Sequence, residues 1–165
     1  TEAVVAVVPL LVLVPLLLWA MRRGWQARAR RQAHVPAPPP APQAVDGEVL
    51  GGVDAVYVTT TSAGRPLDRV VVHGLGVRSN AVVTVSRAGV LVAREGAPDV
   101  WVPTDAVRGA RRQRGMVGKT VEKEGLVVLT WQLGDEQVDT GLRVRRDADR
   151  RRLVDAVRTL VAVAG

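Results

Sequence analysis

The first twenty residues differ in pattern from the rest of the chain. Residues 3–20 read AVVAVVPLLVLVPLLLWA and include no charged side chain. A helix rises about 1.5 Å per residue, so this stretch would span about 27 Å, close to the thickness of the hydrocarbon core of a bilayer. The pattern predicts one transmembrane helix over residues 1–21.

Two other interpretations of this stretch fit less well. A cleaved signal peptide would have basic residues before the apolar run and a small-x-small site after it, and the sequence has neither. A soluble helix that is apolar on every face would need a wide core around it, and the rest of the chain is small for that. Pro9 and Pro15 are tolerated in a membrane helix, at the cost of a kink.

Residues 22–46 are expected to form a basic segment followed by a linker. Five arginines follow the apolar stretch, whereas only Glu2 precedes it, so the positive-inside rule places the N-terminus outside and the C-terminal region in the cytoplasm. Indole rings favour the membrane interface, and guanidinium groups pair with anionic headgroups. The interface residues predicted from this pattern are Trp19, Arg22, Arg23 and Trp25.

The linker contains five prolines between Pro36 and Pro42. Such a run excludes a helix or a sheet ladder and favours an extended polyproline II conformation, which would hold the following domain away from the bilayer. Its PAPP pattern could also bind an SH3-like groove, but a spacer is the favoured interpretation.

From residue 47 to residue 165 the pattern becomes one of short β-rich runs and then a helix. Turn residues at Ser86–Gly89 and Gly134–Glu136 separate runs that should pair antiparallel. Trp101 and Trp131 lie within apolar runs and are expected in the core. The expected strands cover residues 53–61, 68–74, 81–86, 89–95, 99–105, 125–134 and 136–144.

The final segment has helical periodicity. Asp147 is expected to cap a helix whose apolar face holds Leu153, Val157, Leu160 and Ala164, and arginines fill much of the opposite face. Seven strands and one amphipathic helix predict a mainly β domain, a bent sheet or small barrel with the helix sealing one end.

This arrangement resembles that of actinobacterial membrane-anchored pleckstrin-homology-like (PH-like) proteins. The likeness rests on YVTTTSAGRPLDRV (57–70), GVLVAREGAPDVWVP (89–103) and LVVLTWQLGDEQVDTGLR (126–143). It implies a PH-like fold without established enzymatic activity. Pleckstrin-homology domains that bind phosphoinositides use basic residues near their opening strands, whereas the basic cluster of this chain comes late.

The amino-acid composition excludes several kinds of functional site. The chain lacks cysteine, which excludes disulfides and thiolate chemistry, and its only histidines are His34 and His73. His73 lies in an apolar run without the spacing of a catalytic triad, so no catalytic residue, metal or cofactor is predicted. Much of the net charge of +7 follows the apolar stretch directly, and aromatic residues are scarce, so nucleic acid is not an expected partner.

Residues 108–120, RGARRQRGMVGKT, are the strongest candidate for a binding segment. They end in Gly-Lys-Thr, but Gln113 occupies the position of the first P-loop glycine, so nucleotide hydrolysis is not expected. A basic loop could bind an anionic ligand, although a solvated charged loop is the favoured alternative. The candidate contacts are Arg108, Arg111, Arg112, Arg114 and Lys119. A turn is flanked by three acidic residues, and their exposure to solvent there is sufficient to explain their charge. They are Asp135, Glu136 and Asp139.

The sequence thus predicts a single-pass membrane protein with a non-enzymatic binding or scaffolding domain at the inner membrane face. Its partners would be the bilayer, through the N-terminal helix, and a membrane or peripheral protein. The alternatives are a membrane-anchored enzyme with an unrecognised site and an accessory subunit of a transporter, although the apolar stretch has no G-x-x-x-G packing motif.

Overall fold

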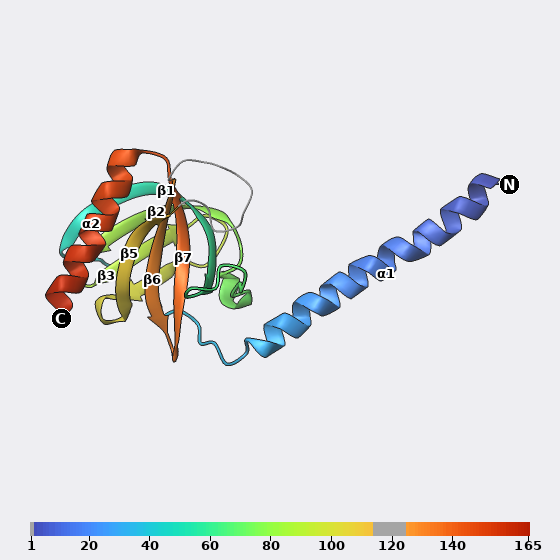
Figure 1. Cartoon of the computed structure of the whole chain (residues 1–165), viewed down its shortest axis with the longest axis horizontal. Coiled ribbons are helices and arrows are strands. Elements are labelled where there is room, and N and C mark those ends of the chain that lie inside the picture. The colour runs from blue at the N-terminus through green and yellow to red at the C-terminus, as the bar shows by residue number, and fades with distance from the viewer. Residues whose placement is uncertain (1, 114–124) are drawn as a thin grey trace. The chain divides into compact units, whose positions relative to one another are not determined.

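The computed structural model describes residues 2–113 and 125–165, which form two units. The first ends at His34 and consists of a long helix, and the second begins at Val35 and holds a sheet and a second helix. Figure 1 shows these elements along the chain. Each unit is described separately below.

Helix α1 (Glu2–Arg31) is 30 residues long and continues through Pro9 and Pro15. The large apolar side chains from Val7 to Leu18 are each at least 46% exposed. Among the described residues, one helix is long and apolar enough to cross a membrane, as judged by length and composition, and it covers Val7–Arg31. The helix therefore extends ten residues beyond Met21 and carries the basic run.

Seven strands form one antiparallel sheet in the second unit. Their order is β4-β3-β2-β1-β7-β6-β5, so the strands from the two ends of the segment meet at β1 and β7 (Figure 1). The strands are β1 (Glu48–Ser62), β2 (Ser79–Ser86), β3 (Gly89–Arg94), β4 (Val100–Pro103), β5 (Val107–Gln113), β6 (Leu126–Leu133) and β7 (Glu136–Val144). Two short 3-10 turns, η1 (Val72–Gly74) and η2 (Thr104–Ala106), and helix α2 (Asp147–Ala164) complete the unit.

The sheet bends along β1, which pairs with β2 and with β7. Register shifts interrupt β1 between Glu48 and Val53 and again between Tyr57 and Thr59. Such irregularities bend a strand and increase its twist. Gly52, with a φ of 57°, adopts the left-handed backbone conformation that the first irregularity needs. The predicted bent sheet with a C-terminal helix is confirmed.

The core is built mainly from valine and leucine, with Trp131 fully buried at its centre. Helix α2 packs against β5 more than against any other element and covers one end of the sheet (Figure 1). Its predicted apolar positions Leu153, Val157 and Leu160 are buried, but Ala164 at the end of the helix is exposed. The predicted burial of Trp101 is also confirmed.

The strand predicted at residues 68–74 is wrong. The segment forms one bridge, between Thr61 and Arg69, and then the turn η1. His73 has a φ of 57° and Gly74 one of 71°, which no strand accommodates. Val70 and Leu75 are nevertheless buried, so this apolar run enters the core as a loop. The two predicted turns are confirmed, because Ser86 pairs with Gly89 and Leu133 with Glu136.

Two further predictions need correction. Residues 107–113 form strand β5, although the sequence pattern suggested a basic loop there. Asp147 is the first helical residue of α2 and the capping position is Arg146, whose side chain makes no capping hydrogen bond. Asp147 instead forms ion pairs with arginine side chains, among them Arg150 and Arg151. Its negative charge also suits the N-terminus of the helix.

Candidate functional site

The arginines of β5 are divided between the two faces of the sheet, because successive side chains of a strand point to opposite faces. Ala110 is buried against the core, and Arg112, two residues later, shares its side and reaches α2. Arg111 points to the other face, where it meets β6 and β7. The described part of the predicted basic segment, residues 108–113, is therefore not one continuous contact surface.

Arg111 belongs to a structural ion pair. Its Nη2 lies 3.0 Å from Oδ2 of Asp139, which is buried on β7, and its Nη1 donates a hydrogen bond to Thr130. Thr130 also donates to Asp139, and the backbone N–H of Gly64 donates to the same carboxylate. Burial raises the pKa of Asp139, but the hydrogen bonds from Arg111, Thr130 and Gly64 outweigh it, so the pKa lies below its usual value.

This network corrects the sequence interpretation of Asp139. The turn position suggested a solvated carboxylate, yet Asp139 is only 4% exposed. A carboxylate that already accepts hydrogen bonds from three groups holds Arg111 in place, on the face of the sheet opposite to the one that Arg112 shares with α2.

Arg112 lines a cleft of about 210 Å³ between β5 and α2. The lining residues are Arg112, Arg151, Val154, Asp155 and Arg158. Asp147 lies at its edge, 3.7 Å from Nη1 of Arg112 and 3.0 Å from Nη1 of Arg151. The cleft thus brings together one arginine from the predicted segment and two from the helix, which sequence spacing alone did not connect.

The other candidate contacts lie elsewhere. Arg108 is exposed, and its Nη1 donates to the carbonyl oxygen of Asp105 at 2.6 Å. Arg114 and Lys119 lie outside the described residues. The three described candidates therefore lie in different surroundings, and of these three only Arg112 lines the cleft.

A buried chain of hydrogen bonds crosses the core and was missed by the sequence analysis. Nε1 of Trp131 donates to the hydroxyl of Thr140, which contacts the hydroxyl of Thr60, which in turn contacts the hydroxyl of Tyr57. Tyr57 donates to the carbonyl oxygen of Leu75 at 2.8 Å. Because an indole N–H only donates and Tyr57 uses its proton on Leu75, every hydroxyl in the chain must point its proton toward Leu75.

Arg94 completes this polar core. Its guanidinium lies 3.8 Å from the centre of the Tyr57 ring and donates to the carbonyl oxygens of Gly74, Val77 and Pro98. Burial raises the pKa of Tyr57 to about 12, despite the opposing effects of Thr60 and Arg94. Burial likewise lowers the pKa of Arg94. These contacts fix the loop after β1, so Arg94 has a structural role.

The start of the proline-rich segment packs on the second unit. Val35 is buried, and its carbonyl oxygen lies 2.8 Å from Nε2 of His73. A Cβ atom on Gly134 would lie 2.7 Å from Cγ of Pro36, so Pro36 contacts the turn between β6 and β7. The predicted division between linker and domain after residue 46 stays a prediction, but Val35 and Pro36 pack with the domain.

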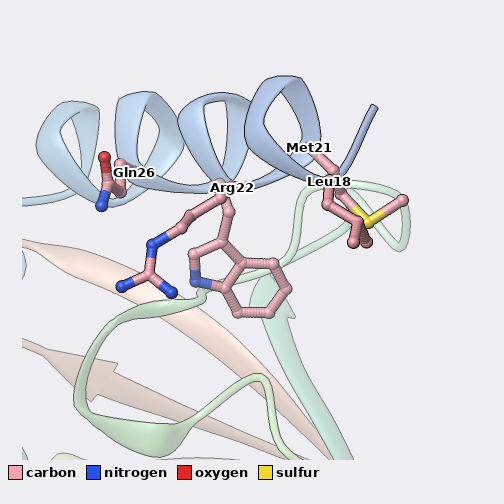
Figure 2. Close-up of a pocket in the computed structure, with 5 residues that line it drawn as sticks. Leu18, Met21, Arg22 and Gln26 are labelled. Carbon is pink, nitrogen blue, oxygen red and sulfur yellow. The ribbon is translucent and has the colours of Figure 1, made fainter. Parts of the chain in front are cut away.

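The four predicted interface residues lie at the end of the apolar part of α1. The Arg23 guanidinium carbon lies 5.1 Å from the centre of the Trp19 ring. Leu18, Met21, Arg22, Trp25 and Gln26 line a shallow hollow on the helix surface. Figure 2 shows that Leu18 and Met21 precede Arg22 and Gln26 along the helix, so the surface changes from apolar to polar within about two turns.

Comparison with known proteins identifies the second unit. The family model described as bacterial PH domain-like matches residues 35–158. The chain belongs to the bacterial PH domain-like family. The match begins at Val35, the residue whose side chain enters the core ahead of β1.

The other comparisons add less. The search of curated proteins found no match. One similar solved structure is that of "Vav1 inhibited by an allosteric inhibitor: Vav1 inhibitors block GEF activity". Its TM-score is 0.38 at 11% identity, with 67% of this chain and 26% of that chain covered. This chain therefore spans about a quarter of the length of that structure.

PH-like domains are generally non-enzymatic binding modules, and nothing in the described part of this one indicates catalysis. Nε2 of His73 is hydrogen-bonded to the backbone of Val35. Within residues 2–113 and 125–165, no group of three or more histidine, cysteine, aspartate or glutamate side chains could hold a metal ion.

A second groove of the PH-like domain, of about 580 Å³, lies over the opening strands. Its polar lining has both signs. The carboxylates are Asp54 on β1, Glu95 just after β3 and Asp149 on α2, and the guanidinium groups are Arg143, Arg145, Arg146 and Arg152. Three carboxylates thus face four guanidinium groups in this groove, whereas one carboxylate and three guanidinium groups line the cleft. The cleft between β5 and α2 is the more cationic of the two.

Proposed function

We propose that this protein is a single-pass membrane protein whose PH-like domain is a non-enzymatic binding or scaffolding module on the cytoplasmic face. The observation that carries the proposal is helix α1, whose apolar side chains are exposed along the whole described part of the apolar stretch. The basic run that follows supports an orientation with the N-terminus outside.

The free energy of burying apolar side chains favours a bilayer around α1. Ten valine and leucine side chains between Val7 and Leu18 are each about half exposed or more. Fully burying one such side chain is worth about 1.5–3 kcal/mol, so leaving the exposed half of all ten in water costs on the order of 10 kcal/mol. A hydrocarbon core removes that cost, and the helical hydrogen bonds satisfy the backbone there.

The interface residues support the same placement. Trp19 and Trp25 flank the end of the apolar part, and Arg22 and Arg23 follow it directly. Arginines near an anionic membrane surface contribute about 1 kcal/mol each. We propose that these four residues fix the depth of the helix in the bilayer.

A tethered domain meets its partners at high local concentration. The tether converts binding to a membrane-associated partner into an encounter confined to the membrane surface, so weak contacts are sufficient. We therefore propose a membrane or peripheral protein, together with the lipid bilayer itself, as the partners of the domain.

The topology can be tested with introduced cysteines, because the natural chain has none. Asp135→Cys places a thiol at the exposed turn between β6 and β7, and Glu2→Cys places one before the apolar stretch. With a membrane-impermeant maleimide on intact cells, we expect labelling of Glu2→Cys alone. Asp135→Cys should react only after permeabilisation. Labelling of Asp135→Cys in intact cells would refute the cytoplasmic placement, and recovery of the detergent-free chain in the aqueous fraction would refute the anchor.

A further inference from the structure

We propose that the cleft between β5 and α2 is a binding site for a phosphate group, supplied by a lipid headgroup or by a soluble phosphate. The site deepens the proposed binding role, on which it rests, by naming a ligand class and the residues that recognise it. The residues that carry it are Arg112, Arg151 and Arg158.

The charge of the cleft favours an anion. Three guanidinium groups line it against the carboxylate of Asp155, and the carboxylate of Asp147 lies beside Arg112 and Arg151 at its edge. The two carboxylates weaken the positive potential without cancelling it, and Val154, the remaining lining residue, is apolar. Arginine is the side chain best suited to phosphate, because its planar fork of N–H donors matches two oxygens at once.

The three arginines retain hydrogen-bonding capacity. Asp147 is shared by Arg112, Arg150 and Arg151, and one carboxylate cannot satisfy the five N–H donors that each guanidinium carries. The contact with Arg112 is long, at 3.7 Å. Arg158 makes no ion pair with any of the described residues. An arriving phosphate can therefore bind without breaking a buried interaction.

The geometry of two elements brings these donors together. Alternation along β5 turns Arg112 toward α2 and Arg111 away from it, where Asp139 holds Arg111. Arg151 and Arg158 are seven residues apart, two turns of α2, so they lie on one face of the helix. The packing of α2 on β5 thus places donors from the strand opposite donors from the helix.

The size of the cleft limits the ligand to one anionic group. Its volume of about 210 Å³ is below the roughly 300–1,000 Å³ of sites that enclose a whole small molecule. A phosphate has more acceptor oxygens and more charge than a carboxylate, so it uses three arginines better. The rest of a phosphate ester would remain outside the cleft.

The experiment uses the full-length chain in neutral detergent micelles, with inorganic phosphate as the probe. Phosphate is titrated at constant ionic strength against chloride while the backbone amide resonances are followed by NMR. We expect saturable shifts of the amides at Arg112 and along residues 151–158. A titration with chloride alone should leave them unchanged.

Three variants and one control assign the binding to the cleft. Arg112→Gln, Arg151→Gln and Arg158→Gln should each weaken phosphate binding about tenfold, as expected for loss of a charge-assisted hydrogen bond. Arg158→Gln is the decisive variant, because it removes no ion pair among the described residues and so leaves the fold unchanged. Arg78→Gln makes the same change of charge at an exposed position outside the cleft and should alter binding less than twofold.

Nanodiscs distinguish the two sources of phosphate. The chain is compared in phosphatidylcholine discs and in discs that also contain phosphatidic acid, whose headgroup is a phosphate monoester. If a lipid supplies the phosphate, the cleft amides shift in phosphatidic acid discs before any inorganic phosphate is added, and more inorganic phosphate is needed to saturate the cleft in these discs than in phosphatidylcholine discs. If a soluble phosphate is the source, only inorganic phosphate shifts them, in both kinds of disc.

The proposal is overturned if the cleft amides fail to respond in micelles and in discs, or if Arg158→Gln binds phosphate as tightly as Arg78→Gln. The micelle titration needs no bilayer and no orientation. A failed topology experiment therefore does not contradict phosphate binding at the cleft. Cleft amides that do not respond to phosphate likewise do not contradict the membrane placement.

Discussion

The two units of this protein use the same side chains in opposite ways. Valine and leucine from Val7 to Leu18 are exposed on every side of α1, whereas valines of the same kind, such as Val83 and Val92, are fully buried in the sheet. Residue type alone did not decide this difference. The sheet and α2 surround their apolar side chains with protein, whereas α1 is apolar on every face from Val7 to Leu18 and is suited to lipid.

The largest expected effect comes from placing charge in the apolar part of α1. In the variant Leu13→Arg with Leu17→Arg, each arginine near the middle of a membrane helix costs about 2.5–3.5 kcal/mol of insertion free energy. We expect most of the chain to move from the membrane fraction to the soluble or degraded fraction. Immunoblotting of fractionated cells measures the change.

The matched control for this variant places arginine on the other unit. Leu67 is exposed in the loop after β1, and Leu67→Arg makes the same chemical change there. It should leave the chain in the membrane fraction. Equal loss of membrane association in both variants would mean that charge, and not the apolar surface of α1, decides the partition.

The second prediction compares two tryptophans. Trp131 is fully buried, whereas Trp25 on α1 is 56% exposed. Trp131→Ala should lower the free energy of unfolding of the PH-like domain by about 3–5 kcal/mol, because it leaves a cavity in the core. Trp25→Ala should leave that free energy unchanged. Denaturant unfolding of the full chain in detergent, followed by circular dichroism, measures both, and a similar loss in the two variants would contradict the division into units.

The sequence predicted most of this fold, because apolar alternation and turn residues were sufficient for six strands and for α2. The prediction failed where the same sequence pattern is compatible with both a strand and a loop. The apolar run at residues 68–74 indicated a strand, but contacts with Arg94 and Tyr57 hold it as a loop. Residues 107–113 contain four polar side chains and only two buried ones, Val107 and Ala110. This is too little apolar alternation to predict a strand.

The candidate site was predictable only in part. The count of arginines was compatible with an anionic ligand, although a solvated charged loop was the favoured interpretation, and sequence spacing groups Arg111 with Arg112. The pairing of β5 with β6 separates the two, and the packing of α2 adds Arg151 and Arg158. The buried position of Asp139 was also invisible, because a turn residue normally faces solvent. Such groupings depend on tertiary contacts between segments about forty residues apart.

The third prediction concerns pH and Asp139. Its pKa in the folded state lies below the unfolded value of about 3.9, so its contribution to stability is complete above that pH and is lost as the pH falls through the folded pKa. Asp139→Asn should therefore cost about 2 kcal/mol near neutral pH. The difference from the natural chain should shrink in acid. A difference that stays constant from neutral pH to pH 3 would show that the charge of Asp139 is not what stabilises the fold.

The smallest effect is expected at Tyr57, the one tyrosine of the chain. Tyr57→Phe removes the hydroxyl that donates to Leu75 and accepts from Thr60, which should cost about 1 kcal/mol below pH 10. The folded pKa is raised to about 12 from an unfolded value of about 10, so the contribution of the neutral hydroxyl is complete below pH 10 and is lost as the pH rises through 12. The natural chain should thus lose stability more steeply than Tyr57→Phe in that range. Because Tyr57 is the one tyrosine of the chain, ultraviolet titration of tyrosinate in the folded chain reports its ionisation directly. Ionisation of Tyr57 near pH 10 without unfolding would mean that its hydroxyl is accessible to water and is not held in the hydrogen-bond chain from Trp131.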